Sequence, residues 1–219
     1  MLISDYLFEN VKNIWDEYLS HNFITELGNG TLSKEKFKDY LIQDYLYLKE
    51  YAKVYAMAFV KCENMDQMKF CQESINGILE DESATHIWYL KNFGEKIEKL
   101  EKYETKKANE DYTSYMKSIA LTGDLLEIMV SVLPCAWSYY YIGEKMKAIY
   151  KDKLQGNFFK AWIDSYSSEE YGVVVKSSIE FVDRLCENID ENKKERLKDI
   201  FIKGSIHEMK FWDMAYEDK

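Results

Sequence analysis

Apolar residues recur at helical spacing over most of the chain. In the first such stretch, about residues 6–20, Leu7, Val11 and Trp15 fall on one stripe. Strands and hairpins need frequent turn residues, and this chain has only one proline and nine glycines. The pattern predicts an all-α protein of seven or eight helices. We expect the other helices at about residues 33–60, 65–93, 111–121, 124–150, 157–164, 167–186 and 190 to near the C-terminus.

Polar residues mark the expected ends of several helices. Ser33 is a candidate N-cap, and Asp124 and Ser167 each precede a glutamate by three residues, which resembles a capping box. Residues 28–30 are expected to form a loop, and the Lys- and Glu-rich residues 95–109 a solvated helix end and surface loop. No linker, repeat or composition break interrupts the chain, so we expect a single domain over residues 1–219.

Composition narrows the class of protein. With 47% hydrophobic and 31% charged residues, the chain is typical of a folded protein. The formal net charge of -10 argues against nucleic acid as a partner. No stretch approaches the roughly 20 uninterrupted apolar residues of a membrane span, so we expect no membrane partner. The N-terminus lacks the positive charge of a secretory signal, which predicts a cytoplasmic location. The four cysteines form no C-x-x-C pair, so we expect reduced thiols.

Pro134 and Cys135 lie inside an otherwise helical, aromatic-rich stretch. An interior proline removes one backbone hydrogen bond and kinks or restarts a helix. If the helix restarts at Pro134, Cys135 would lie in its first turn, where backbone N–H groups and the helix dipole favour a thiolate. The plainer alternative is a buried structural cysteine beside a kink, and the spacing by itself favours that alternative.

One helix face carries Asp44, Tyr47 and Tyr51 at positions i, i+3 and i+7. A tyrosine stripe is more often core or interface than pocket, but an acid within it must be exposed, paired or bound to a polar ligand. Tyr139 follows Cys135 by one turn and shares its face. With 18 tyrosines, 5 tryptophans and 11 phenylalanines, we expect some of the aromatic rings to line a site for a planar ligand.

A metal site has little support. Glu82 and His86 are spaced i, i+4, whereas the di-iron pattern of helical bundles needs Glu and His at i, i+3 on two helices. We therefore interpret His86 as a structural hydrogen-bonding residue. His21 is a weak candidate for a haem ligand, and Glu208 taken alone would be interpreted as a surface acid.

Five segments together resemble the thiaminase II (TenA-type) family. Most specific is the combination of Pro-Cys-x-Trp-x-Tyr, which ends at Tyr139, with Trp-Ile-x-x-Tyr-x-Ser-x-Glu, which contains Tyr166. The resemblance implies a haem-oxygenase-like helical bundle without haem. Glu82, His86, Tyr89 and Gly94 match a further family element, which we assign to structure. The five segments are residues 40–47, 112–115, 133–139, 162–170 and 208–212.

The resemblance also implies an activity, aminopyrimidine aminohydrolase. Such an enzyme hydrolyses 4-amino-5-aminomethyl-2-methylpyrimidine, and thiamin more slowly, to the 5-hydroxymethyl compound in thiamin salvage. The resemblance also implies that Cys135 is the nucleophile, that Glu208 is the acid and base, and that Asp44 forms hydrogen bonds with the ring nitrogen and the 4-amino edge. It further implies no metal, no organic cofactor and a homotetramer. The substrate-binding aromatic residues would be Tyr47, Tyr112, Tyr139, Tyr166 and Phe211, with Tyr51 a weaker candidate.

Two other classes of function stay open. A non-catalytic pyrimidine-binding or regulatory protein on the same fold would bind ligand without turnover. A haem or di-metal oxygenase would require ligands that we do not find in the sequence.

Overall fold

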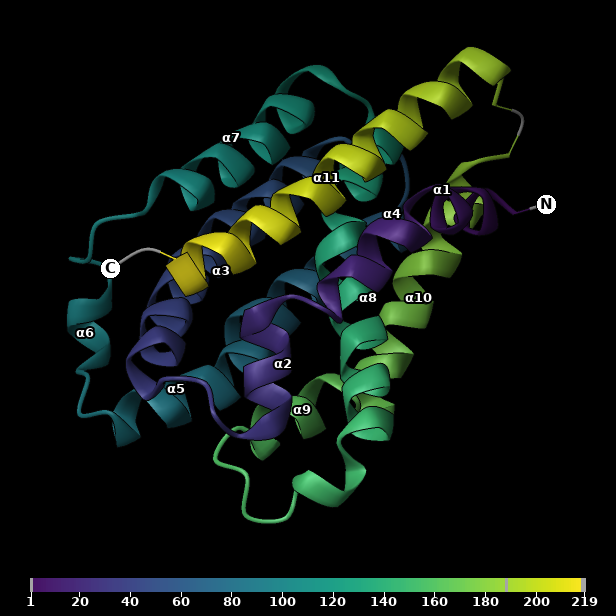
Figure 1. Cartoon of the computed structure of the whole chain (residues 1–219). Helices are drawn as coiled ribbons and strands as arrows, with labels where there is room; N and C mark the ends of the chain where they lie inside the picture. Colours follow the sequence, from purple (N-terminus) through teal and green to yellow (C-terminus); the bar gives the residue numbers. More distant parts are fainter. Residues whose placement is uncertain (1, 188, 218–219) are drawn as a thin grey trace.

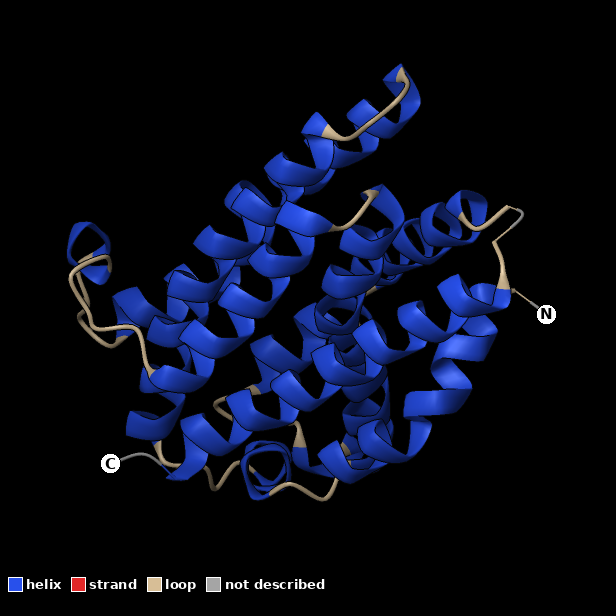
Figure 2. Cartoon of the chain, turned by 90° about the horizontal axis from the view of Figure 1, so that it is seen from above, coloured by secondary structure: helices blue, strands red, loops and turns tan. Residues whose placement is uncertain are grey.

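The computed structural model describes residues 2–187 and 189–217, and among these it leaves the side chains of residues 81–83 undescribed. The described residues form helices and no strand, which confirms the all-α prediction (Figure 2). The elements are α1 (Ile3–Tyr18), α2 (Asn22–Asn29), α3 (Lys34–Val60), α4 (Met65–Asn76), the π-helical segment η1 (Gly77–Glu82), α5 (Ser83–Asn92), α6 (Ile97–Leu100), α7 (Lys107–Thr122), α8 (Leu125–Ile149), the 3-10 turn η2 (Lys151–Lys153), α9 (Lys160–Tyr166), α10 (Glu169–Leu185) and α11 (Glu191–Glu217).

The helix α8 lies at the centre of the bundle. It packs against α11, α10, α9, α7 and α3 (Figure 1). By length and a mean hydropathy of 1.3 it is apolar enough to cross a membrane, but 78% of that window is buried inside the protein. The apolar residues of α8 therefore form part of the core of the bundle, together with residues of α3, α7 and α11.

Most of the expected helix ends are found within a few residues. Ser33 is the N-cap of α3, and the Asp124 carboxylate accepts a hydrogen bond from the Glu127 N–H at 2.9 Å. The expected helix at residues 65–93 exists as α4, η1 and α5 in succession. The expected cap at Ser167 was one residue too early, because Ser168 accepts the hydrogen bond from the Tyr171 N–H.

The expected loop at residues 28–30 was wrong. Residues Asn22–Asn29 form α2, and only Gly30 leaves the helix, with the left-handed φ of 75° that glycine adopts without strain. The reason is burial: Phe23, Ile24 and Leu27 present one apolar face to the core. This packing outweighs the weak helix preference of the glycine at the end of the helix.

Of the two alternatives for Pro134, a kink or a restart of the helix, the restart is not found. Pro134 lies inside the continuous helix α8, so Cys135 is in the middle of a helix and has no helix N-terminus beside it. Burial of the turns on both sides holds the helix together through the missing hydrogen bond. The proline ring fits because Gly204 of α11 faces it: a Cβ at Gly204 would lie 2.8 Å from Pro134 Cγ.

Gly143 permits the close approach of α8 to the end of α9. A Cβ at this position would lie 2.7 Å from the carbonyl carbon of Tyr166 and 3.0 Å from the Ser167 nitrogen, both backbone atoms. We expect Gly143→Ala to lower the free energy of unfolding by about 1–3 kcal/mol in urea titrations, because backbone cannot move aside as a side chain can.

The matched control is Gly77→Ala, where an added Cβ meets nothing within 4 Å and the backbone is helical. This variant is expected to be neutral or slightly more stable than the wild type. Equal stability of Gly143→Ala and the wild type would show that the two helices can separate at little cost.

Candidate active site

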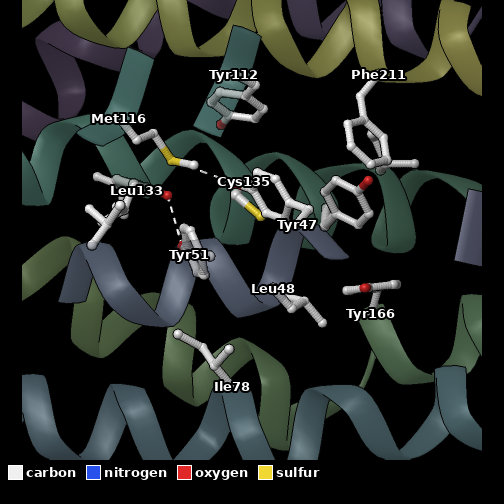
Figure 3. Packing of buried hydrophobic residues seen from close by; sticks show 14 of the residues in the cluster. Tyr47, Leu48, Tyr51, Ile78, Tyr112, Met116, Leu133, Cys135, Tyr166 and Phe211 are labelled. Carbon is white, nitrogen blue, oxygen red and sulfur yellow. Dashed lines mark hydrogen bonds between the residues drawn. The ribbon is translucent and has the colours of Figure 1, made fainter. Parts of the chain in front are cut away.

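A small cavity lies between α3, α7, α8 and α11. The residues around it are buried, and none exposes more than 6% of its surface. The cavity joins acidic, thiol and aromatic groups that are remote in sequence. Of these residues, Figure 3 shows Tyr47, Tyr112, Cys135 and Phe211. Its lining consists of Asp44 and Tyr47 from α3, Tyr112 from α7, Cys135 and Tyr139 from α8, and Glu208 and Phe211 from α11.

These seven residues are among the nine that the sequence selected, and the other two lie outside the lining. The hydroxyl of Tyr51 donates a hydrogen bond to the Val132 carbonyl at 2.9 Å (Figure 3). The ring of Tyr166 packs on Tyr139 with 4.8 Å between centroids. Tyr51 and Tyr166 therefore adjoin the cavity wall rather than form it.

Glu208 is a buried acid, not a surface one. It is 2% exposed, and its Oε1 accepts a hydrogen bond of 2.7 Å from the Tyr112 hydroxyl. Burial, followed by the negative charge of Glu208, raises the pKa of Tyr112 well above its usual value. Tyr112 therefore remains an O–H donor at neutral pH, and it orients the carboxylate at the cavity.

Tyr47 provides a second phenol beside the thiol. Burial, followed by charge on Cys135, raises its pKa well above the usual value. Its O–H contacts Met116 Sδ at 3.7 Å, a weak hydrogen bond (Figure 3). Because this partner is weak, the hydroxyl can turn to a better acceptor, such as a thiolate. The sequence had not indicated Met116.

Stacked rings make the opposite wall rigid. Tyr139 stacks on Trp212 with 5.1 Å between ring centroids, and Tyr40 stacks on the same indole at 5.5 Å. The Tyr40 hydroxyl lies 3.4 Å from the Tyr139 hydroxyl. Offset stacks of this kind contribute roughly 0.5–1.5 kcal/mol each beyond area burial. The ring of Tyr139 in the cavity wall is therefore held in place by the rings packed against it.

Behind Asp44 lies His86 of α5, whose Nδ1 is 2.8 Å from Asp44 Oδ2. The other ring nitrogen of His86 is 3.2 Å from the Tyr166 hydroxyl. Sequence reasoning had assigned His86 to structure and did not connect it with either residue. The side chain of Glu82, from the same family element, lies outside the described side chains. Among the described residues, no three His, Cys, Asp or Glu side chains gather into a metal-binding group.

His207 supports Tyr112 from outside the cavity. Its ring stacks almost parallel on Tyr112, at 5.1 Å between centroids and an angle of 4°, and on Tyr115 at 5.2 Å. Burial, and then the nearby Lys210 and Lys203, lower the pKa of His207 to about 4. The imidazole is therefore neutral wherever the protein is near neutral pH.

This shift predicts a dependence of stability on pH. An unfolded histidine has a pKa near 6.5, so between pH 6.5 and about 4 the unfolded chain binds a proton that folded His207 does not. The free energy of unfolding should therefore fall as the pH drops through this window, by roughly 2 kcal/mol between pH 6.5 and 5 from this residue.

We expect His207→Phe, which keeps a flat ring without a titratable nitrogen, to remove this contribution. Urea titrations at pH 7 and pH 5 measure it as a smaller difference between the two pH values in the variant. An equal difference in the two proteins would contradict the lowered pKa.

The fold and the cavity define a class of protein: an all-helical bundle in which a thiol, two carboxylates and aromatic rings line one buried cavity. The sequence profile described as the TENA/THI-4/PQQC family matches residues 8–218, so the chain belongs to that family. This finding agrees with the resemblance to thiaminase II.

Relatives and solved structures match over nearly the whole chain. An "Aminopyrimidine aminohydrolase" of Helicobacter pylori is 38% identical and covers 99% of this chain and 100% of its own. The structure of a "TenA family transcription regulator" from Silicibacter sp. TM1040 has a TM-score of 0.90 at 26% identity, with 98% and 96% of the two chains covered. A protein from Shewanella denitrificans described as having a "heme oxygenase-like fold" has a TM-score of 0.74 at 15% identity, covering 98% and 92%, which confirms the fold.

Proposed function

We propose that this protein is an aminopyrimidine aminohydrolase, a thiaminase II. It would hydrolyse 4-amino-5-aminomethyl-2-methylpyrimidine to the 5-hydroxymethyl compound with release of ammonia, and thiamin more slowly, in thiamin salvage. The 38% identity to the Helicobacter pylori aminopyrimidine aminohydrolase over the full length supports this activity. The observation that carries the proposal is that Cys135 and Glu208, from α8 and α11, line one buried cavity with Asp44.

In this proposal Cys135 adds to the ring carbon next to the one that bears the aminomethyl arm. The C–S bond forms as a ring π bond opens. The electron pair then forms the exocyclic C=C bond and expels the amine, to which Glu208 supplies the proton as the exocyclic C–N bond breaks. Water then adds to the exocyclic methylene and gives up a proton to Glu208, which closes the proton balance. The C–S bond breaks last and the aromatic ring is restored.

The other lining residues would hold the ring during these steps. Asp44 would accept hydrogen bonds from the 4-amino edge, because a buried carboxylate forms strong hydrogen bonds with N–H donors. Tyr139 and Phe211 would cover the faces of the ring. The Tyr47 hydroxyl would donate a hydrogen bond to the thiolate, and the Tyr112 hydroxyl would donate one to Glu208. Burial keeps both phenols protonated because it raises their pKa values.

The test is a comparison of products. The purified protein is incubated with 4-amino-5-aminomethyl-2-methylpyrimidine and, separately, with thiamin, and the products are identified by mass spectrometry. The proposal expects the 5-hydroxymethylpyrimidine from both and faster turnover of the aminomethyl compound. Tight binding by calorimetry with no product over hours would instead favour a pyrimidine-binding or regulatory protein, the kind of role named for the Silicibacter structure.

We also propose that the protein is a cytoplasmic single domain over residues 1–219 that assembles as a homotetramer. Exposed apolar side chains on the surface of the single chain, such as Trp88 at 55% and Val173 at 63%, support burial against other copies. Stable assemblies of this kind commonly bury 2,000 Å² or more per interface. Sedimentation velocity measures the assembly, and a monomer at micromolar concentration would contradict it.

A further inference from the structure

Three buried side chains from different helices lie in a row that starts at the cavity. Asp44 of α3 lines the cavity, His86 of α5 lies behind it, and Tyr166 at the end of α9 lies beyond His86. The separations are 2.8 Å from Asp44 Oδ2 to His86 Nδ1 and 3.2 Å from His86 Nε2 to the Tyr166 hydroxyl. None of the three exposes more than 6% of its surface. The row therefore connects the cavity to a phenol that does not line it.

The contacts determine where the ring of His86 carries its proton. Nδ1 and Oδ2 are within ion-pair distance, although not aligned as a straight hydrogen bond. Two acceptor atoms this close would repel each other, so we assign a proton to Nδ1. Nε2 then carries a lone pair and accepts the O–H of Tyr166.

We propose that His86 is a positioning residue that holds Asp44 as a hydrogen-bond acceptor toward the cavity, and that Tyr166 acts on the bound ring through His86. This inference rests on the proposed function and specifies its substrate selectivity. The proton on Nδ1 neutralises part of the charge on Oδ2 and turns one side of the carboxylate away from the cavity. The remaining lone pairs of Asp44 face the ligand.

An acceptor at this position selects the chemistry of the ring edge. A pyrimidine with a 4-amino group offers N–H donors to the carboxylate. In a pyrimidine with a 4-oxo group the exocyclic atom is an acceptor and the donor moves to the neighbouring ring N–H, so the carboxylate oxygen that would accept from the amino group meets an acceptor instead. The row therefore selects 4-aminopyrimidines and rejects 4-oxopyrimidines.

The first experiment compares two substrates that differ only in this group, 5-aminomethyl-2-methylpyrimidine with a 4-amino or a 4-oxo substituent, by the rate of ammonia release. For the wild type, kcat/KM should favour the amino compound by at least about 100-fold. His86→Phe, which removes both ring nitrogens, should reduce that preference by about tenfold or more. His86→Asn places an amide N–H near the position of Nδ1 and should restore most of it.

The matched control is Tyr89→Phe. Tyr89 is also buried on α5, but its hydroxyl donates to the Phe158 carbonyl at 2.9 Å, outside the row. The substrate preference should remain at the wild-type value in this variant. Loss of preference in Tyr89→Phe would show that disturbing α5 is sufficient, and would overturn the specific role of His86.

A double-mutant cycle tests whether Tyr166 acts through His86. Tyr166→Phe should lower the preference in the wild-type background and have little further effect in His86→Phe, because the two changes break one chain of contacts. Additive effects of the two changes would mean that Tyr166 reads the ring independently, and would overturn this part of the inference.

A measurement on the unmodified protein keeps the inference testable if the variants fail to fold. Nitrogen-15 spectra of histidine-labelled protein have three ring systems to assign, those of His21, His86 and His207. His86 should show a protonated Nδ1 and an unprotonated Nε2. A proton on Nε2, alone or on both nitrogens, would overturn the inference.

Failure of the proposed function gives a different result. If the wild type releases no ammonia from the 4-amino compound, the hydrolase proposal is wrong. Calorimetry with 4-amino- and 4-oxo-5-hydroxymethyl-2-methylpyrimidine then measures the same preference without turnover. Turnover with an unchanged preference in folded His86→Phe would instead leave the hydrolase intact and refute the role of His86.

Discussion

Replacing Cys135 by serine is expected to reduce kcat/KM for 4-amino-5-aminomethyl-2-methylpyrimidine by at least about 10³-fold. The hydroxyl of serine is nearly the same size, but it ionises far less readily than a thiol and adds poorly to an aromatic ring. In the structure this sulfur lines the cavity from the middle of α8, so no helix N-terminus assists its ionisation. The assay measures ammonia release under saturating and subsaturating substrate.

Cys71→Ser is the matched control for this prediction. Cys71 is as buried as Cys135, but it lies in α4, and its sulfur is 3.7 Å from that of Cys62, away from the cavity lining. Its activity should stay within about threefold of the wild type. Normal turnover by folded Cys135→Ser would refute the nucleophilic role. Activity lost equally in both variants would indicate that a buried serine disturbs the fold.

Glu208→Gln is expected to lower kcat by roughly 10²- to 10⁴-fold, the range by which general acid–base groups accelerate reactions. The amide keeps the shape of the side chain, and its oxygen can still accept the 2.7 Å hydrogen bond from Tyr112. It cannot deliver a proton to the leaving amine or take one from water. Binding of the product should therefore change much less than turnover, which calorimetry measures alongside the kinetics.

Glu127→Gln separates loss of an acid–base group from loss of a buried charge. Glu127 is also a buried glutamate, 6% exposed, but its Oε1 pairs with Arg196 Nε at 2.6 Å and Lys193 Nζ at 3.0 Å. Burial raises the pKa of Glu127, but the two cations lower it further, so the net pKa lies below the usual value. This variant should lose stability and keep its kcat. A loss of kcat as large as that of Glu208→Gln would contradict the assignment.

The pattern of the sequence predicted the helical class and most helix bounds because the signals are local. Asp124 caps α8 by accepting a hydrogen bond from the Glu127 N–H three positions on, and Ser33 occupies the N-cap position of α3. Where non-local packing decided the outcome, the sequence predicted it wrongly or left it open. The loop expected at residues 28–30 is the end of α2, because one face of that helix is buried. Pro134, for which a restart had been left open, stays inside α8 because residues 125–135 are buried and Gly204 leaves room for the ring.

The residues of the cavity were selected from the sequence by family resemblance, not by spacing. From spacing alone, Glu208 was interpreted as a surface acid. Periodicity carries no information about which helices pack against each other, so it could not show that Glu208 is buried. The bond from Tyr112 to Glu208 joins residues 96 positions apart, and such a pair has no local signature.

The sequence by itself therefore determined that this protein is an all-α bundle and which side chains are candidates for chemistry, since helix periodicity and short motifs are properties of neighbouring residues. Only the tertiary structure decided that four helices place a thiol and two acids around one cavity, and that His86 lies between Asp44 and Tyr166. The physical reason is that burial and hydrogen bonds between helices depend on packing over the whole chain, which no short segment encodes.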